Sequence, residues 1–186
     1  MRLYFHVDRN KNLQTGDILN RISFDDIFIL PAMFPFADRK YLDHLKRLCS
    51  EGLSMHGSRY LTLDLADSPV DYVSFMIELQ FEYIRHIYYK NMPSRLQSAF
   101  AFSEYEQALK FKRERGNNGR IFEVNFSGRC FVEDMNLMTT KLKPEAQEQI
   151  AHQYWSGKPK IYDEGYVPCR ECLIDLPVTI GREITE

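Results

Sequence analysis

The sequence has few of the features that mark membrane, secreted or nucleic-acid-coating proteins. No run approaches the roughly 20 consecutive apolar residues of a membrane-spanning helix. The N-terminus, with an early histidine, aspartate and arginine, has no signal-peptide core. A formal net charge of −2 gives no overall attraction for nucleic acid, although local basic clusters still matter because binding depends on where charge lies. We therefore expect a cytoplasmic protein without a membrane partner.

Cysteine is also scarce, with four residues in the chain. Cys169 and Cys172 form a C-x-x-C pair, but a structural zinc site needs two further ligands, which the scattered histidines do not offer at a recognisable spacing. We expect reduced thiols, as is usual in the cytosol, and no metal site.

What the sequence does contain is enough chain for one domain with a buried core, at 186 residues. Residues 1–22 and 94–186 carry short β-rich runs with turn signals, whereas residues 37–91 have helical periodicity. We predict a single domain over residues 1–186, with residues 23–92 as a mainly helical insertion.

Two helices are expected in the insertion. The first follows Asp38 as its cap and stops at Gly52. The second begins at Ser68-Pro69 and ends before Pro93. Between them, the alternation of residues 59–65 predicts a short strand.

The second half of the chain alternates strands and helices. Residues 93–102 form a strand pattern, and Ser103 with Glu106 makes a capping box for a helix that runs to about Arg115. A further strand is predicted over residues 120–126, followed by a helix over residues 144–155. Two last strands are predicted over residues 171–177 and 178–184.

A single histidine stands near the start of the chain. His6 lies in the apolar run 3–7 and is followed by a polar loop that closes at Gly16. A histidine in an apolar strand is more often a packed core residue than a ligand, so this segment alone favours core packing. The rest of the chain reverses that preference.

The order of strands and the motifs at 119–124 (GRIFEV), 133–136 (EDMN) and 177–184 (PVTIGREI) resemble the ADP-ribosyltransferase superfamily. They are similar to the small rifamycin-inactivating members and to an uncharacterised bacterial branch with a helical insertion. The resemblance covers residues 3–18 and 94–184. It implies an α+β fold, with a split pair of small antiparallel sheets around an NAD cleft.

The resemblance also implies how NAD is held. The NAD-gripping histidine of the family falls on His6, and the backbone that follows it, at Val7 and Asp8, would help to hold a ribose hydroxyl and the nicotinamide amide. Phe100 occupies the place of the tyrosine that usually stacks on nicotinamide, which keeps an aromatic face but loses a hydroxyl. Ser98 lies near the serine of the arginine-modifying branch.

Two acidic residues compete for the catalytic role. The rifamycin-modifying relatives have an essential aspartate in the turn that matches Asp134, whereas toxin-like branches use a glutamate at the start of the last strands, which Glu171 fits. A carboxylate is needed because cleavage of the nicotinamide–ribose bond develops positive charge on the ribose. Arg95 is a further candidate, since a guanidinium group suits pyrophosphate.

We therefore expect transfer of ADP-ribose from NAD to a macromolecular acceptor, nucleic acid slightly ahead of protein, with release of nicotinamide. Bacterial relatives of this size often act as toxins or phage-defence effectors, which makes an antitoxin or inhibitor protein a candidate partner. Two alternatives stay open. One is a catalytically silent NAD- or nucleotide-binding module, and the other is a protein-interaction domain whose helical insertion is the working surface.

Overall fold

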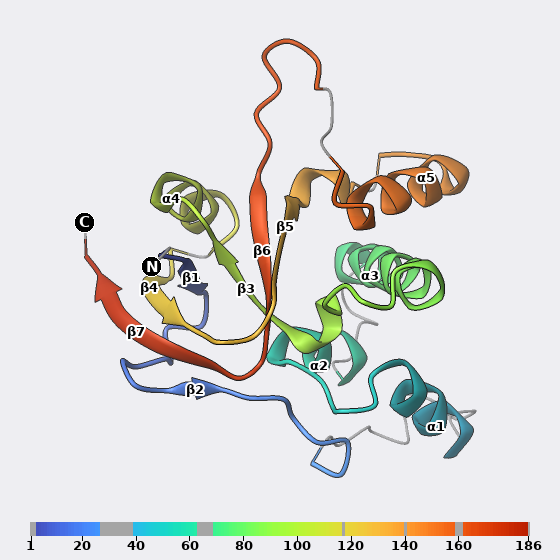
Figure 1. Ribbon diagram of the computed structural model, residues 1–186, viewed down its shortest axis with the longest axis horizontal. Helices are drawn as coiled ribbons and strands as arrows, with labels where there is room; N and C mark the ends of the chain where they lie inside the picture. The colour runs from blue at the N-terminus through green and yellow to red at the C-terminus, as the bar shows by residue number, and fades with distance from the viewer. Residues whose placement is uncertain are drawn as a thin grey trace.

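The computed structural model describes residues 3–26, 39–62, 69–116, 118–139, 141–158 and 162–185. Within these ranges the chain forms seven strands and five α-helices (Figure 1). The strands are β1 (Phe5–Asp8), β2 (Ile18–Leu19), β3 (Ser98–Phe102), β4 (Arg120–Asn125), β5 (Cys130–Asp134), β6 (Arg170–Asp175) and β7 (Val178–Ile184). The helices are α1 (Arg39–Leu48), α2 (Met55–Thr62), α3 (Pro69–Tyr88), α4 (Tyr105–Glu114) and α5 (Pro144–Trp155).

All seven strands belong to one antiparallel sheet, in the order β2-β7-β4-β1-β3-β6-β5. The expected α+β class is confirmed, but the expected split into two separate sheets is wrong. The reason lies in β1, which pairs along β4 through four residues and also reaches β3 through the Phe5–Phe102 pair. This pair joins two half-sheets, β2-β7-β4-β1 and β3-β6-β5, into one.

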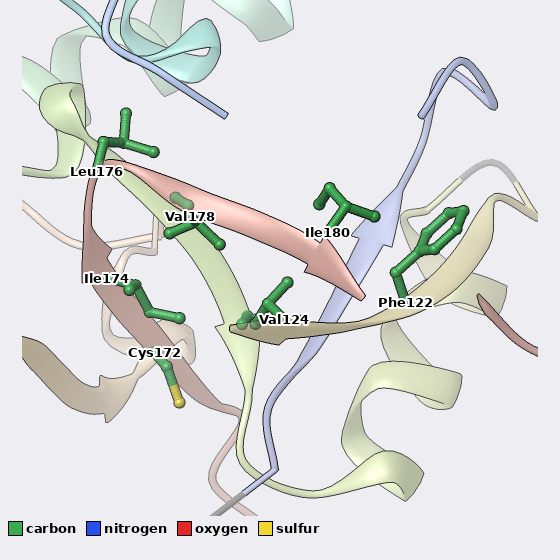
Figure 2. Close-up of a cluster of buried hydrophobic side chains, with 9 residues drawn as sticks. Phe122, Val124, Cys172, Ile174, Leu176, Val178 and Ile180 are labelled. Atoms are coloured by element: carbon green, nitrogen blue, oxygen red, sulfur yellow. The ribbon is translucent and has the colours of Figure 1, made fainter. Parts of the chain in front are cut away.

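The sheet curves around a core to which both half-sheets contribute. Figure 2 shows Cys172 and Ile174 of β6 beside Val178 and Ile180 of β7 and Val124 of β4. Side chains from strands at opposite ends of the sheet therefore share one apolar cluster. Because side chains alternate along a strand, Leu173 of β6 faces the other way, toward the helices.

Helices cover that second face. Ile77 and Phe81 of α3 pack against Tyr154 and Trp155 of α5 and against Leu173. The Trp155 indole N–H donates a 2.8 Å hydrogen bond to the Phe81 carbonyl oxygen, so the two helices are held in register. The helix α4 closes the neighbouring part of the same face. Its cluster consists of Val7, Phe102, Ala108, Leu109 and Ile121.

Most helices match their sequence signals. The helix predicted over residues 144–155 is confirmed as α5, and the one predicted from Ser68-Pro69 is confirmed as α3. The first helix, α1, ends at Leu48, and Gly52 follows it with φ +93°, a conformation that favours glycine. Asp38, its expected cap, lies outside the described residues.

Two local predictions are wrong. Residues 59–62 are not a strand but belong to α2, because Ser54 accepts a hydrogen bond from the Gly57 N–H and so starts a helix there; residues 63–65 lie outside the described residues. The capping box at Ser103 is absent because α4 starts one residue later, with Glu104 at the N-cap and no side-chain cap bond from it.

The strand predicted over residues 93–102 is shorter than expected. Its first part is a 3₁₀ turn, η2 (Arg95–Gln97), in which Ser94 accepts a hydrogen bond from the Leu96 N–H. The turn matters for the site, because it places Arg95 just before the first residue of β3.

Gly57 allows α2 to pack against this turn. A Cβ atom added at Gly57 would lie 2.2 Å from the Leu96 carbonyl oxygen, so Gly57→Ala must push α2 away. We expect a loss of about 1–3 kcal/mol in the free energy of unfolding, measured by urea denaturation. Met55→Ala, at an exposed position of the same helix, should change it by less than about 0.5 kcal/mol. Equal effects of the two substitutions would contradict this close packing.

Candidate functional site

His6 lies where the two half-sheets meet. Its Nδ1 is 2.7 Å from the carbonyl oxygen of Phe100, a residue 94 positions away in the chain. Because a carbonyl only accepts, Nδ1 is the donor. Burial lowers the pKa of His6, against smaller opposing effects of the Phe100 hydrogen bond and of Asp8, and favours the neutral ring.

The rings of His6 and Phe100 lie on different faces of the sheet. Phe5 pairs with Phe102, so strand alternation puts Phe5 and Phe100 on the helix-covered face and His6 on the inner one. The two residues meet because the imidazole reaches the Phe100 backbone. A ligand that contacts both rings must therefore span the point where β1 and β3 separate.

The residues after His6 serve the fold. Val7 is buried in the cluster beneath α4. The Asp8 carboxylate accepts hydrogen bonds from the N–H groups of Asn10 (3.2 Å) and Leu13 (2.9 Å) and forms a 3.3 Å ion pair with Arg120. These contacts hold the turn after β1 and engage the Asp8 carboxylate within the fold.

The Phe100 ring is contacted by two polar side chains. The Cζ atom of Arg95 lies over it, 4.9 Å from the ring centroid, and the His56 ring centroid is 4.4 Å away. Ser98, two residues earlier on the same face, is buried and donates a 2.6 Å hydrogen bond to the Ser94 carbonyl oxygen. Ser98 thus supports the turn before β3.

Arg95 is the centre of a buried ionic group that we call the Arg95 cluster: Glu78, Arg95, Tyr154 and Glu171. Its Nε and Nη2 donate to the two carboxylate oxygens of Glu78 at 2.8 and 3.0 Å. Its Nη1 donates to the Tyr154 hydroxyl at 2.7 Å and to Oε1 of Glu171. Tyr154 in turn donates to Glu171 Oε1 at 2.9 Å. Four elements, α3, η2, α5 and β6, therefore meet at one guanidinium.

The protonation states in this cluster follow from its contacts. Burial alone would raise the pKa of Glu78, but Arg95 and His56 outweigh it and hold that pKa at about 2. Burial raises the pKa of Tyr154 well above its usual range. At neutral pH, Glu78 is therefore ionised and Tyr154 is a hydrogen-bond donor.

The lowered pKa of Glu78 predicts acid sensitivity. Its stabilising effect is fully present above the unfolded pKa of 4.5 and is lost as the pH falls toward about 2. We expect a loss on the order of 3 kcal/mol across this window, measured by urea unfolding at a series of pH values. Glu78→Gln should be less stable near neutral pH and show a weaker acid dependence. The same slope in both proteins would contradict the assignment.

The two candidate carboxylates have different surroundings. Asp134 accepts hydrogen bonds from the N–H groups of Asn136 (3.1 Å) and Cys169 (2.9 Å) and from the Tyr166 hydroxyl (2.6 Å). It caps the 3₁₀ turn η3 (Met135–Leu137) and holds the loop before β6. Glu171 instead belongs to the Arg95 cluster.

Glu133 lies opposite Glu171 in the sheet, although the sequence motif pointed to its neighbour Asp134. The register pairs Glu133 with Glu171 and Asp134 with Arg170, so Glu133 shares the face of Glu171. Both glutamates are buried. Glu133 and Asp134 are consecutive in β5, but Glu133 lies beside the Arg95 cluster whereas Asp134 caps a turn.

Three residues in or beside the Arg95 cluster were not predicted from the sequence: His56, Glu78 and Tyr154. His56 Nε2 is 3.1 Å from Glu78 Oε1. No sequence signal marks Glu78, His56 or Tyr154, because tertiary packing brings Glu78 and Tyr154 to Arg95 and brings His56 to Glu78.

Metal and membrane features can be stated for the described ranges. They contain no group of three or more His, Cys, Asp or Glu side chains arranged to hold a metal ion. Cys169 and Cys172 pack in different apolar clusters. None of the helices in these ranges is long and apolar enough to cross a membrane.

Comparison with known proteins places the chain in a family. A search of curated proteins gave no match. The model of a family described as "Protein of unknown function (DUF2441)" matches residues 4–186, which is nearly the whole chain. The protein therefore belongs to the DUF2441 family.

Proposed function

We propose that this protein transfers ADP-ribose from NAD to a macromolecular acceptor and releases nicotinamide. The observation that carries the proposal is a continuous set of contacts at the half-sheet junction. His6 binds the Phe100 backbone, Arg95 lies over the Phe100 ring, and the same guanidinium binds Glu171. His6, Phe100 and Glu171, three of the residues that the ADP-ribosyltransferase resemblance selects, are thus linked through Arg95, although they come from three distant segments of the chain.

In this proposal NAD lies across the junction. The nicotinamide half contacts His6 and Phe100, where β1 and β3 separate after the Phe5–Phe102 pair. Glu171 stabilises the positive charge that develops on the ribose as the nicotinamide–ribose bond breaks. We favour Glu171 over Asp134 because the oxygens of Asp134 are engaged in capping a turn and holding a loop.

Arg95 has a supporting role in this scheme. Its N–H groups are engaged by Glu78, Tyr154 and Glu171, so it orients Glu171 rather than binding pyrophosphate. A fixed carboxylate needs little reorganisation when charge develops, which is the basis of electrostatic catalysis.

The acceptor is proposed to be nucleic acid, ahead of protein. The helices α2 and α3 border the site through His56 and Glu78 and add more surface than a small-molecule acceptor needs. Such an activity would suit a toxin or phage-defence effector that an antitoxin or other inhibitor protein restrains.

One observation favours a second candidate, a module that binds NAD without turnover. Glu171 is buried and bound by both Arg95 and Tyr154, and two side chains contact the ring of Phe100. If these contacts persist when NAD binds, the carboxylate stays away from the ribose.

Isotope-labelled NAD tests the proposal. The protein is incubated with NAD labelled in the adenosine moiety and with RNA, DNA or protein separately, followed by mass spectrometry. We expect label in one acceptor class with wild type, and none with His6→Asn, whose amide can still reach the Phe100 carbonyl. His86→Asn, a histidine on α3 outside the site, is the control and should keep activity. No label and no NAD binding would overturn the proposal, whereas NAD binding without label would favour the silent module.

A further inference from the structure

We propose that His56 is a positioning residue for Glu171, acting through Glu78 and Arg95. This inference rests on the proposed function for its catalytic consequence. It gives the helices α2 and α3, which lie outside the ADP-ribosyltransferase resemblance, a part in the site.

The contacts form a continuous chain. His56 Nε2 is 3.1 Å from Glu78 Oε1 and, because Glu78 is ionised, acts as the donor. Oε1 and Oε2 of Glu78 accept from Nη2 and Nε of Arg95, which leaves Nη1 directed to Glu171. Along this series of hydrogen bonds the exposed fraction of the side chain falls from 26% at His56 to 6% at Glu78 and 3% at Glu171. The hydrogen bonds thus connect a partly exposed imidazole to the buried carboxylate.

His56 is fixed in place by the start of α2. The N–H and hydroxyl of Ser54 both donate to the Leu96 carbonyl oxygen, at 2.8 and 3.0 Å. Leu96 is the residue after Arg95, and Gly57 permits close contact with the same turn. The backbone that carries His56 is therefore attached to the turn that carries Arg95.

His56 supplies Glu78 with a hydrogen bond in addition to those from Arg95. One guanidinium serves two buried carboxylates, and a hydrogen bond from His56 satisfies part of Glu78. Without that donor, Glu78 is held less firmly and can turn away from Arg95. The orientation of Nη1 toward Glu171 then loosens, and a small misplacement of a reacting group costs a large factor in rate.

Two substitutions separate the hydrogen bond of His56 from its ring contacts. His56→Phe keeps an aromatic ring against Phe100 and Tyr60 but removes the donor to Glu78. His56→Gln keeps an N–H donor but removes the ring. With NAD as substrate, we expect kcat for nicotinamide release to fall about 10- to 100-fold in His56→Phe, with KM within about threefold of wild type. His56→Gln should retain most of the wild-type kcat.

A second readout needs no NAD. The Arg95 Nε–H is buried and hydrogen-bonded, so its hydrogen exchange, followed by NMR, should be slow in wild type. We expect exchange at least about 10-fold faster in His56→Phe, and close to wild type in His56→Gln and in the control His86→Phe.

The outcomes distinguish the two proposals. Faster Arg95 exchange in His56→Phe, with no NAD turnover by wild type, would retain the link from His56 to Arg95 and overturn the proposed function. Unchanged exchange in folded His56→Phe would overturn the inference, and so would equal loss of kcat in both variants, because the ring rather than the donor would then matter.

Discussion

Arg95→Met should destabilise the protein by about 3–5 kcal/mol, measured by urea denaturation at neutral pH. The Arg95 side chain is 4% exposed, and its guanidinium pairs with both Glu78 and Glu171. Its removal leaves two buried carboxylates without their counter-charge, which costs more than the loss of the pairs themselves. The destabilisation should shrink as the pH falls, because the Arg95 guanidinium lowers the pKa of Glu78 and this stabilising effect is lost once Glu78 binds a proton.

An exposed ion pair provides the control. Arg182 pairs with Glu123 at 2.7 Å, but its side chain is 75% exposed. Arg182→Met should therefore cost less than about 1 kcal/mol. An Arg95→Met protein that is as stable as Arg182→Met would show that the Arg95 cluster does not hold its four elements together.

Glu171→Gln should reduce nicotinamide release from NAD by about 100-fold or more. Glutamine keeps the shape of the side chain and an oxygen that accepts from the Tyr154 hydroxyl, but it removes the negative charge that is proposed to stabilise the ribose. Release is measured by chromatography at saturating NAD, with thermal unfolding as a check that the variant is folded.

Asp134→Asn is the matched comparison. It weakens hydrogen bonds that cap η3 and hold the loop before β6, so the melting temperature should fall while kcat stays within about threefold of wild type. The opposite pattern, with kcat lost in Asp134→Asn and kept in Glu171→Gln, would assign the catalytic role to Asp134.

Much of the fold could be predicted because local signals and packing agree. In α5, Pro144 starts the helix and the buried residues Ala151, Tyr154 and Trp155 lie on one face. In β4, a short β-rich run predicted a strand that is confirmed, with Ile121, Phe122 and Val124 buried on its two faces. These elements need no distant partner to identify them.

Helix α3 shows where periodicity alone misleads. Val73 and Tyr88 fit the apolar repeat but are exposed, whereas Glu82 and Arg85 are buried and hydrogen-bonded to each other. The buried face of α3 is broader than an apolar stripe because its charged residues find partners there. Such pairing depends on tertiary packing and leaves only a weak trace in the sequence.

Some residues of the candidate site could be selected from the sequence, and others could be found only from the packing. The family resemblance pointed to Phe100 and to Glu171 or Asp134, and the chemistry of a guanidinium group pointed to Arg95; of these, Arg95 contacts Phe100 and Glu171. The resemblance could not select Glu133 over Asp134 beside Glu171, since that choice depends on the register of β5 against β6. Nor could it select His56, which reaches Glu78 only because α2 packs on η2.

The half-sheet junction is best tested by an NMR titration of the protein with NAD. We expect saturable chemical-shift changes of the His6 imidazole and the Phe100 ring, since NAD is proposed to lie across the point where β1 and β3 separate. A titration in which neither residue responds would contradict the placement of NAD at this junction.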